Sequence, residues 1–507
     1  MVKLGRQKRN RVTRVVRPLL RSKHCCLTRC NVGQVAPIAI LPDDALLAIF
    51  DLHVKAPDDL SLASKGKIEA WQTLVHVCRR WRNLVFESPR RLNLRLVCTY
   101  RTHVKNTLDV WPALPLCIYG FNNCPAKNVD DIVAALGHSD RIRQVVIRHL
   151  GRRGLMEVWA AMGVPFPELT DLRLRALGEW TPTVPNLFLG GSAPLLRNLE
   201  LESFPFPGLL KLLLSATNLV TLRLLYIPKS GYFSPKAMAT CLSVLTGLRE
   251  LVIIFKFNYP HAKIRHLSPL NRFVLPALTD FEFSGVAQYL EDLVVHIDSP
   301  RLNNLKITFS HQNHFETPQL FQFMNRTPRL EAPDKAILTF QSPVFRIIMS
   351  SQRSDKVTVD IRNARSFSTR NSDQQVLALA DVCTSAFPLL STVENLRFND
   401  HVLAPAEWED NIESAPWLEL LRPFTAVKSL YLSERCEPRV ALALQELVEG
   451  RMMEVLPNLE NLFLWDLRPS GPFHEGIVQF VAVRQLTHPI LVFRWEGRFE
   501  PGPYSLW

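Results

Sequence analysis

Apolar residues recur along most of the chain in one eight-residue pattern, x-x-L-x-x-L-x-L, in which x is a variable residue. The closing alternation of leucine, variable residue and leucine is typical of a short strand that buries one face. Seven full copies, some with aromatic or branched replacements, are PELTDLRL (167–174), PLLRNLEL (194–201), TNLVTLRL (217–224), TGLRELVI (246–253), PALTDFEF (276–283), PRLNNLKI (300–307) and PNLENLFL (457–464). Weaker copies are AILTF (336–340), KVTVDI (356–361), VENLRF (393–398) and VKSLYL (427–432).

The spacing of these copies indicates leucine-rich repeats. Helical patterns such as PGLLKLLLSA (207–216) and SPKAMATCLSVLTG (234–247) lie between the strand patterns. A unit of one strand and one helix cannot bury its own apolar face, so the copies are predicted to stack into a solenoid. We expect parallel strands on the concave face of an irregular arc and helices outside. The first strand leucine returns every 23 to 30 residues, the period of such repeats, at Leu172, Leu199, Leu222, Leu251, Phe281 and Leu305.

The alternation also predicts which side chains face a partner. If Leu172 and Leu174 point inward, their neighbours point to the concave face. Large aromatic side chains there are typical of binding hot spots. Alternatively, the C-terminal segment IVQFVAVRQL (477–486) covers the aromatic residues. The predicted client-binding residues are Arg173, Arg175, Arg223, Tyr431, Phe463 and Trp465, and the same phase places Asp171, Asn198, Glu200, Glu202, Glu250, Asp280, Glu282 and Lys306 on that face.

Two amphipathic helices are predicted before the repeats. Pro42 followed by Asp43 and Asp44 is a helix start, because proline lacks only a donor that is unpaired there and carboxylates favour the positive end of the helix dipole. This helix is expected over about residues 42–54. Apolar residues at helical spacing predict a second helix, which ends at Ser88 and Pro89; they are Trp71, Leu74, Val75, Cys78, Trp81 and Val85.

The order of residues in these helices resembles the F-box motif. LPDDALLAIFDL (41–52), followed after a long connection by LVHVCRRWRNL (74–84), is similar to its pattern of Leu-Pro, an acidic residue, leucines, Ile-Phe and a later Val-Cys-Arg-x-Trp. Residues 88–120 and 477–497 look like the expanded F-box family of fungi. The resemblance implies positions that pack within the motif or against the Skp-type adaptor of a cullin ubiquitin ligase: Leu41, Pro42, Leu46, Ile49, Phe50, Val77, Cys78 and Trp81.

The charge of the chain is concentrated at its N-terminus. The formal net charge is +13, but residues 1–30 hold ten Lys or Arg and no acidic residue, which leaves 50 basic and 47 acidic residues elsewhere. A nucleic-acid partner is therefore not indicated for the folded body. Residues 1–36 read as a disordered basic arm, a mitochondrial transit peptide or, through RQKRNR (6–11), a nuclear import patch.

Candidate chemistry is sparse. The ten cysteines have no disulfide-framework spacing, which favours a reducing compartment, cytoplasmic or nuclear. His24, Cys25, Cys26 and Cys30 form the only cluster, and no second ligand pair follows to complete a zinc site, so no metal is expected. Phosphate loops and hydrolase motifs are absent, so neither an enzyme nor a cofactor is expected. No apolar run reaches the 18 or so residues that span a bilayer, and no membrane partner is expected.

These patterns predict an α/β protein in three parts: a basic arm (1–36), a short helical F-box (37–89) and a leucine-rich-repeat solenoid with a C-terminal cap (90–507). The expected function is a substrate-recognition adaptor of a Skp/cullin/F-box ubiquitin ligase, which binds a protein client through the repeat surface. The alternative is a leucine-rich scaffold that binds protein without any ligase. The identity of the client is not encoded in the periodicity.

Overall fold

The computed structural model forms two compact units, a helical unit (37–54 and 70–92) and a sheet unit from residue 93 onward. The predicted basic arm with its His24–Cys30 cluster, the connection 55–69 and Trp465 lie outside the described residues. The structure describes residues 37–54, 70–99, 104–120, 129–176, 181–256, 272–310, 317–330, 333–341, 344–351, 356–362, 376–377, 379–380, 383–384, 388–400, 414–433, 437–447, 454–464, 472–485 and 488–494.

The first predicted helix is confirmed. It is α2 (Asp43–Val54), preceded by the short α1 (Pro37–Ile40), and both carboxylates of its first turn lie where they were expected. The Pro42 carbonyl accepts hydrogen bonds from the N–H groups of Ala45 and Leu46. The proline thus begins the helix without using an N–H group, which it lacks.

The second predicted helix is divided in two, contrary to the expectation of one continuous helix. α4 (Ala70–Val75) ends in a turn, and α5 (Arg79–Glu87) begins after Cys78, whose backbone is extended (φ −155°). The break leaves the Val75 carbonyl without a helical N–H partner, and the Arg82 Nε donates to it instead at 3.0 Å. Arg82 therefore joins the two helices.

Aromatic side chains hold the helical unit together. Phe50 of α2 is fully buried, and its ring lies 4.7 Å from the Trp81 ring of α5, centroid to centroid. Trp71 of α4 is also buried and contacts Phe86 at 6.2 Å. The three helices share one small apolar core, as the amphipathic spacing predicts.

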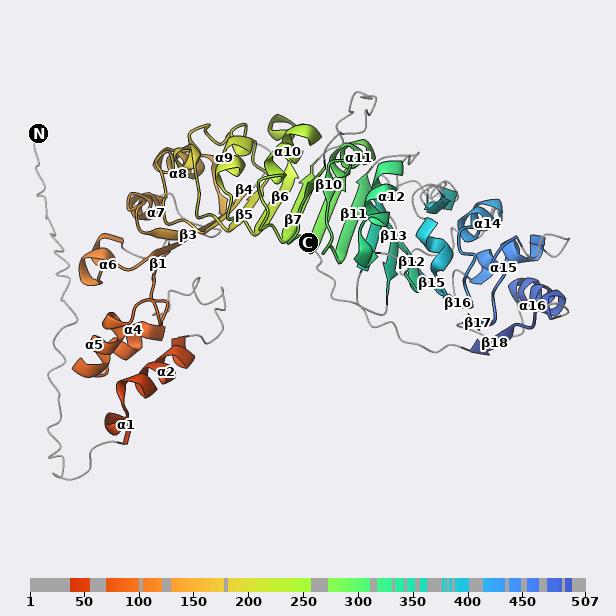
Figure 1. Cartoon of the computed structure of the whole chain (residues 1–507), viewed down its shortest axis with the longest axis horizontal. Coiled ribbons are helices and arrows are strands. Elements are labelled where there is room, and N and C mark those ends of the chain that lie inside the picture. The colour runs from red at the N-terminus through yellow and green to blue at the C-terminus, as the bar shows by residue number, and fades with distance from the viewer. Residues whose placement is uncertain are drawn as a thin grey trace, which may run out of the picture. The chain divides into compact units, whose positions relative to one another are not determined.

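The sheet unit is built on one large, mostly parallel sheet of sixteen strands in the described part of the chain (Figure 1). Two further short strands, β8 (Phe273–Val274) and β10 (Ile297–Asp298), pair with each other. The sixteen strands, in sheet order, are β1 (Leu96–Thr99), β2 (Leu116–Gly120), β3 (Ile142–Leu150), β4 (Asp171–Ala176), β5 (Asn198–Glu202), β6 (Thr221–Ile227), β7 (Glu250–Phe255), β9 (Asp280–Gly285), β11 (Asn304–Ser310), β14 (Lys356–Arg362), β13 (Val344–Ser350), β12 (Lys335–Gln341), β15 (Asn395–Asp400), β16 (Ser429–Leu432), β17 (Asn461–Leu464) and β18 (Leu491–Arg494).

Each predicted strand copy forms a parallel strand of this sheet, and the predicted leucines share one row. Leu172 pairs in register with Leu199, and the row continues strand by strand to Leu305. Every member of the row is at most 2% exposed. A shift of one residue in the pairing of two strands would turn each leucine to the other face of the sheet. Burial of the leucines therefore specifies how neighbouring strands align.

The strands β12, β13 and β14 depart from the expected all-parallel order. They form an antiparallel meander that runs back along the sheet, so that β14 pairs with β11 and β12 pairs with β15. Only residues 342–343 separate β12 from β13. A parallel crossover needs a dozen or more residues, so such a short connection can join only antiparallel strands.

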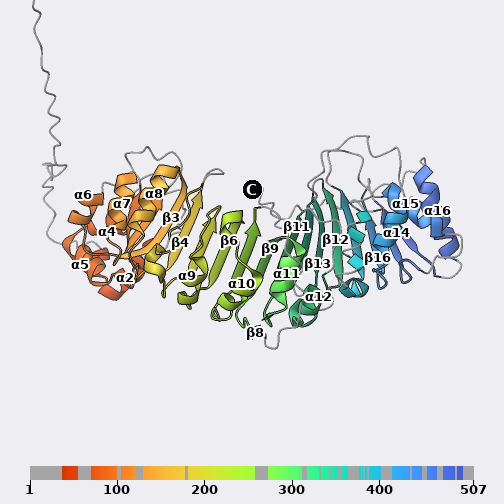
Figure 2. The same ribbon diagram turned by 90° about the horizontal axis from the view of Figure 1, so that it is seen from above.

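Most helices of the sheet unit lie above its strands in Figure 1, and Figure 2 looks down onto this helix layer. Consecutive helices contact one another from α6 to α8, from α9 to α12 and from α14 to α16, and the predicted helices at 207–216 and 234–247 are α9 and α10. The described helices are α6 (Val104–Val110), α7 (Val129–Leu136), α8 (Arg152–Ala161), α9 (Leu209–Ser215), α10 (Pro235–Leu242), α11 (Ala287–Val294), α12 (Pro318–Asn325), α14 (Ala415–Leu421), α15 (Glu437–Glu446) and α16 (Pro472–Arg484), with short 3-10 turns at Phe188–Gly191, Lys229–Gly231, Pro328–Leu330 and Pro388–Thr392.

A buried carboxylate joins two of these helices. Glu291 of α11 accepts hydrogen bonds from the N–H groups of Gln319 (2.8 Å) and Leu320 (2.7 Å) in the first turn of α12. The Glu291 carboxylate therefore caps α12 in place of Thr317, the residue before the helix, whose side chain makes no capping hydrogen bond. Burial raises the pKa of Glu291 to about 7, and nearby Asp292 adds to the rise, while the two hydrogen bonds oppose it.

This carboxylate makes the stability of the fold pH-dependent. The pKa is raised in the folded state, so unfolding releases a proton, and the contribution is fully present below about pH 4.5 and lost as the pH rises to about 7. We expect the protonated Glu291 side chain to contribute up to about 3 kcal/mol to the unfolding free energy. Urea titrations at several pH values between 4.5 and 8 should show that the unfolding free energy falls less with rising pH for Glu291→Gln than for the wild type. Parallel curves would contradict the assignment.

Candidate interaction surfaces

One face of the large sheet carries the apolar rows toward the helices, and the opposite face, named here the open face, carries the alternate residues. Trp417 of α14 lies against Phe340 and Phe398, which marks the side that the helix layer covers. The central row of the open face runs through successive strands in register, from Thr99, Tyr119, Val146, Arg173, Glu200, Arg223, Val252, Glu282, Lys306 and Thr358 to Ile348, Ile337, Arg397, Tyr431, Phe463 and Phe493.

Charged residues in the first half of the open face pair with one another across neighbouring strands. The Arg223 Nε donates to Glu250 at 2.9 Å, and the Lys306 ammonium lies 2.7 Å from Glu282. The Arg175 guanidinium lies 2.9 Å from the buried carboxylate of Glu202, whose pKa is raised by burial despite the arginine. These side chains hold neighbouring strands together.

Two of the predicted client-binding arginines therefore have structural partners. Arg175 and Arg223 each neutralise a carboxylate, whereas Arg173 is half-buried and forms no ion pair within the described residues. Their predicted contact with a client stays a prediction. Glu202 was expected to face outward and is buried, because its neighbour Arg175 covers it as an ion-pair partner.

The other end of the open face carries a stack of aromatic rings. The Tyr431 and Phe463 rings lie 4.3 Å apart and nearly parallel, at 7°. Phe493 continues the stack 5.0 Å from Phe463, and the Arg397 guanidinium lies 5.5 Å from the centre of the Tyr431 ring. Neighbouring strands are about 4.8 Å apart, so side chains in one row meet at stacking distance. All four side chains are partly exposed.

The sequence pattern identified Tyr431 and Phe463 but missed Arg397 and Phe493 as members of this stack. Arg397 stands in a weaker copy whose outward residue was not assigned. Phe493 lies on β18, where Val492 holds the position that Leu462 holds on β17. On β17 a buried leucine, Leu459, lies three residues before that position, whereas on β18 the buried Ile490 lies only two residues before it. The shortened copy concealed the strand, although Pro489 precedes it as a proline precedes several other copies.

The alternative in which residues 477–486 cover Tyr431 and Phe463 is wrong for the described residues 477–485, and it stays a prediction for Trp465, which lies outside the described residues. Its residues belong to α16, which packs on α15 in the helix layer. Arg484, the last residue of α16, is buried there and donates to the carbonyl oxygens of Leu456 and Pro457. The segment is therefore held on the side of the sheet away from Tyr431 and Phe463.

The helical unit separates the predicted adaptor-binding residues into two groups. Leu46 and Phe50 are buried in the unit's own core, and Trp81 and Leu41 are half-buried. The exposed members are Pro42, Ile49 (43% exposed), Val77 (59% exposed) and Cys78, and Leu52, one turn from Ile49 on α2, adds a further exposed apolar side chain. Exposed aliphatic side chains at this density are typical of an interaction surface.

The ends of these helices are fixed by arginine. The Arg80 guanidinium donates to the Asp43 carboxylate at 2.6 and 3.0 Å and to the Leu41 carbonyl at 2.6 Å. Arg91 pairs with Asp44 at 3.4 Å. Asp43 therefore positions the start of α2 against α5, Asp44 pairs with the segment that follows α5, and the Leu41 carbonyl is held by the same arginine as Asp43.

Ligand-binding chemistry is sparse in the described residues. Burial raises the pKa of the Cys98 and Cys241 thiols to about 11, so both remain protonated at neutral pH. No group of three or more His, Cys, Asp or Glu side chains that could hold a metal ion occurs in the described ranges. None of the helices in those ranges has the length and apolar character to cross a bilayer.

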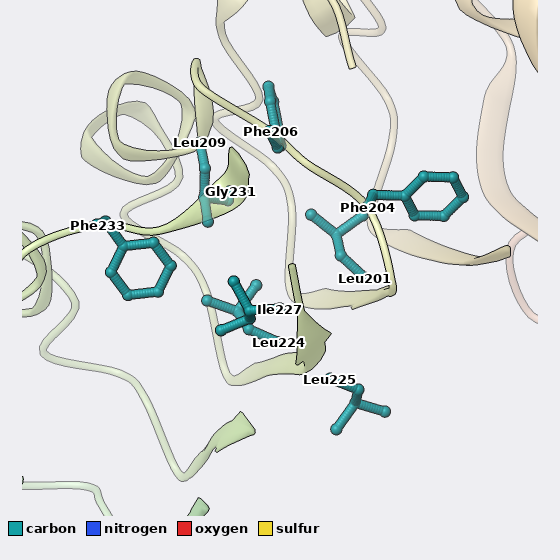
Figure 3. A pocket seen from close by; sticks show the side chains of 9 residues that line it. All are labelled: Leu201, Phe204, Phe206, Leu209, Leu224, Leu225, Ile227, Gly231 and Phe233. Carbon is teal, nitrogen blue, oxygen red and sulfur yellow. The ribbon is translucent and has the colours of Figure 1, made fainter. Parts of the chain in front are cut away.

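A small hollow lies between β5, β6 and α9 (Figure 3). Its lining is apolar, without a side chain that could orient a ligand by hydrogen bonds. We interpret it as imperfect packing. The lining residues are Leu201, Phe204, Phe206, Leu209, Leu224, Leu225, Ile227, Gly231 and Phe233.

Comparison with known proteins adds no relative. No protein-family model matches the chain, and no curated protein matches it. The similarity to the F-box motif therefore depends on the residues quoted above.

Proposed function

We propose that the chain is a substrate-recognition adaptor of a Skp/cullin/F-box ubiquitin ligase, in which the helical unit is an F-box and the sheet unit an irregular leucine-rich-repeat solenoid. The observation that carries the proposal is the division of the motif residues. Leu46 and Phe50 are buried in the unit, while Ile49 and Val77 are exposed for a partner. A compact helical unit that leaves aliphatic side chains in water is suited to docking.

The second unit supports the same role. Its strands align in register, and from β4 onward the open face carries partly exposed charged and aromatic side chains, a surface suited to protein recognition. The chain would act by proximity, because a client held near a ubiquitin-charged partner presents its lysines at high effective concentration. The chain itself would supply no catalytic group or cofactor, and a reducing compartment, cytoplasm or nucleus, suits its scattered cysteines.

The alternative is a leucine-rich protein-binding scaffold without a ligase role. The aromatic stack Tyr431–Phe463–Phe493 favours protein binding whether or not the helical unit binds an adaptor. In this case the exposed side chains of α2 would serve another contact.

Binding to a purified Skp-type adaptor distinguishes the two. We expect the full chain to form a stable complex, and the double variant Ile49→Ala with Val77→Ala to bind at least tenfold more weakly, because two exposed aliphatic side chains lose their contacts at the interface. Met156→Ala, which truncates another exposed apolar side chain on α8, is the matched control and should bind normally. Isothermal titration calorimetry measures the affinity.

Circular dichroism of each protein establishes that it is folded. A folded wild-type chain that forms no adaptor complex would reject the ligase role and leave the scaffold. Equal adaptor affinity of the double variant and the wild type would reject the assigned docking residues.

A further inference from the structure

The last six strands of the sheet carry one continuous, largely apolar row on the open face. We name it the C-terminal stripe, and all of its side chains are partly exposed. It runs across β13, β12, β15, β16, β17 and β18 in register and consists of Ile348, Ile337, Arg397, Tyr431, Phe463 and Phe493. Phe493 is 40% exposed at its end.

Positive charge lies beside this stripe. Lys335 and Lys356 occupy the neighbouring row, two strands apart through Ser350. Both are exposed, and neither forms an ion pair with a described residue. Among the described side chains on the open face of β12 to β18, one is a carboxylate, Asp360. It is 1% exposed and accepts hydrogen bonds from Arg346. In the described part of this row, the exposed positive charge therefore comes from Lys335 and Lys356.

The dimensions of the surface suit a linear segment. Six strands about 4.8 Å apart extend the stripe over roughly 24 Å. That length corresponds to about seven residues of an extended chain or about sixteen of a helix. The lysine row lies two residues along each strand from the stripe, or about 7 Å away. One segment can therefore contact both rows.

We infer that the C-terminal stripe with Lys335 and Lys356 binds a linear client segment in which acidic residues adjoin aliphatic or aromatic ones. The inference rests on the proposed client-binding function and names the chemistry of the client. Apolar side chains of the segment cover the stripe, and its carboxylates meet the two lysines at the β12–β14 end. The charge of the surface selects an acidic segment over a basic one.

The same geometry favours a protein over a nucleic acid. A base binds by stacking on an aromatic face. In the stack, Phe463 lies between Tyr431 and Phe493, and Arg397 lies over the Tyr431 ring, so Tyr431 and Phe463 present mainly their edges. Ring centroids 4.3 and 5.0 Å apart leave no space for a base between them.

A random twelve-residue phage-display library, selected on the immobilised full chain, tests the inference. We expect the recovered peptides to be enriched in Asp or Glu next to Phe, Tyr, Trp, Leu or Ile. The most enriched peptide, synthesised with a fluorescent label, gives affinities by fluorescence anisotropy. Lys335→Glu with Lys356→Glu should weaken it about tenfold, because attraction becomes repulsion, and Phe463→Ala should weaken it at least tenfold.

The matched control is Lys211→Glu with Lys236→Glu, which reverses two exposed lysines on α9 and α10 in the helix layer and should leave the affinity unchanged. The inference is overturned if no peptide is enriched, if basic peptides are selected, if the Lys335 and Lys356 variant binds as the wild type does, or if labelled (dT)12 binds as tightly as the peptide. Because the two lysines are exposed, their reversal remains informative even if Phe463→Ala is unstable.

Adaptor affinity, measured on the same variants, separates this inference from the proposed function. Loss of peptide binding with normal adaptor binding supports a client surface apart from the docking unit. Peptide binding by a chain that binds no adaptor would keep the inference and reject the ligase role.

Discussion

Trp417→Ala is expected to lower the unfolding free energy by about 3–5 kcal/mol, the usual cost of truncating a fully buried tryptophan. Trp417 on α14 is 1% exposed and lies 5.3 Å from Phe340 of β12 and 6.1 Å from Phe398 of β15, between ring centroids. It joins the helix layer to the sheet where the meander meets the parallel strands. Urea unfolding followed by far-UV circular dichroism measures the loss.

Trp417→Phe is the matched control. The buried Trp417 Nε1 has no hydrogen-bond partner in the described structure, so its removal sacrifices no hydrogen bond and relieves an unsatisfied donor. A phenylalanine keeps most of the apolar contact, and we expect a loss below about 1.5 kcal/mol. Similar losses for the two variants would show that the tryptophan does not stabilise the fold mainly through packing.

Arg346→Met is expected to cost a similar amount, about 3–5 kcal/mol, because it leaves a buried carboxylate without its counter-ion. The Arg346 guanidinium on β13 donates to both oxygens of Asp360 on β14, at 2.7 and 2.9 Å. Asp360 is 1% exposed. The pair therefore joins the antiparallel strand to its neighbour, and the same denaturation measurement reports its loss.

The double variant Arg346→Met with Asp360→Leu tests the cause. If the cost of the single variant comes from an unpaired buried charge, removal of both groups should restore at least half of the lost stability, because apolar residues replace an ion pair at little net cost. A double variant less stable than Arg346→Met alone would contradict this explanation. The Arg223–Glu250 pair is more exposed, and its disruption should cost under about 1 kcal/mol.

Much of the sheet followed from the sequence pattern. The alternation in each copy identified the strands and the inward leucines, since burial of one face specifies strand register. It also placed Tyr431 and Phe463 correctly in one outward row. Local pattern was sufficient where a strand and its neighbour carried the same template.

Three features did not follow from it. The meander carries a strand-like pattern but no sign of strand direction, and VFRIIMS (344–350) was not recognised as the antiparallel strand β13. Apolar spacing continued through His76–Cys78, although the helix breaks there and Arg82 satisfies the freed carbonyl. Pairing of Arg175 and Arg223 with neighbouring strands depends on contacts between residues 27 positions apart.

The sequence by itself determined which residues of the strand copies are buried, where α2 begins and that Tyr431 and Phe463 lie in one outward row, because each depends on local spacing and on the removal of apolar surface from water. The tertiary structure alone decided that β14 and not β12 follows β11, that Phe493 and Arg397 extend the aromatic stack, and that most carboxylates of the open face already have cationic partners. These features arise from pairing between distant segments, whose energies depend on geometry in space and leave no periodic trace along the chain.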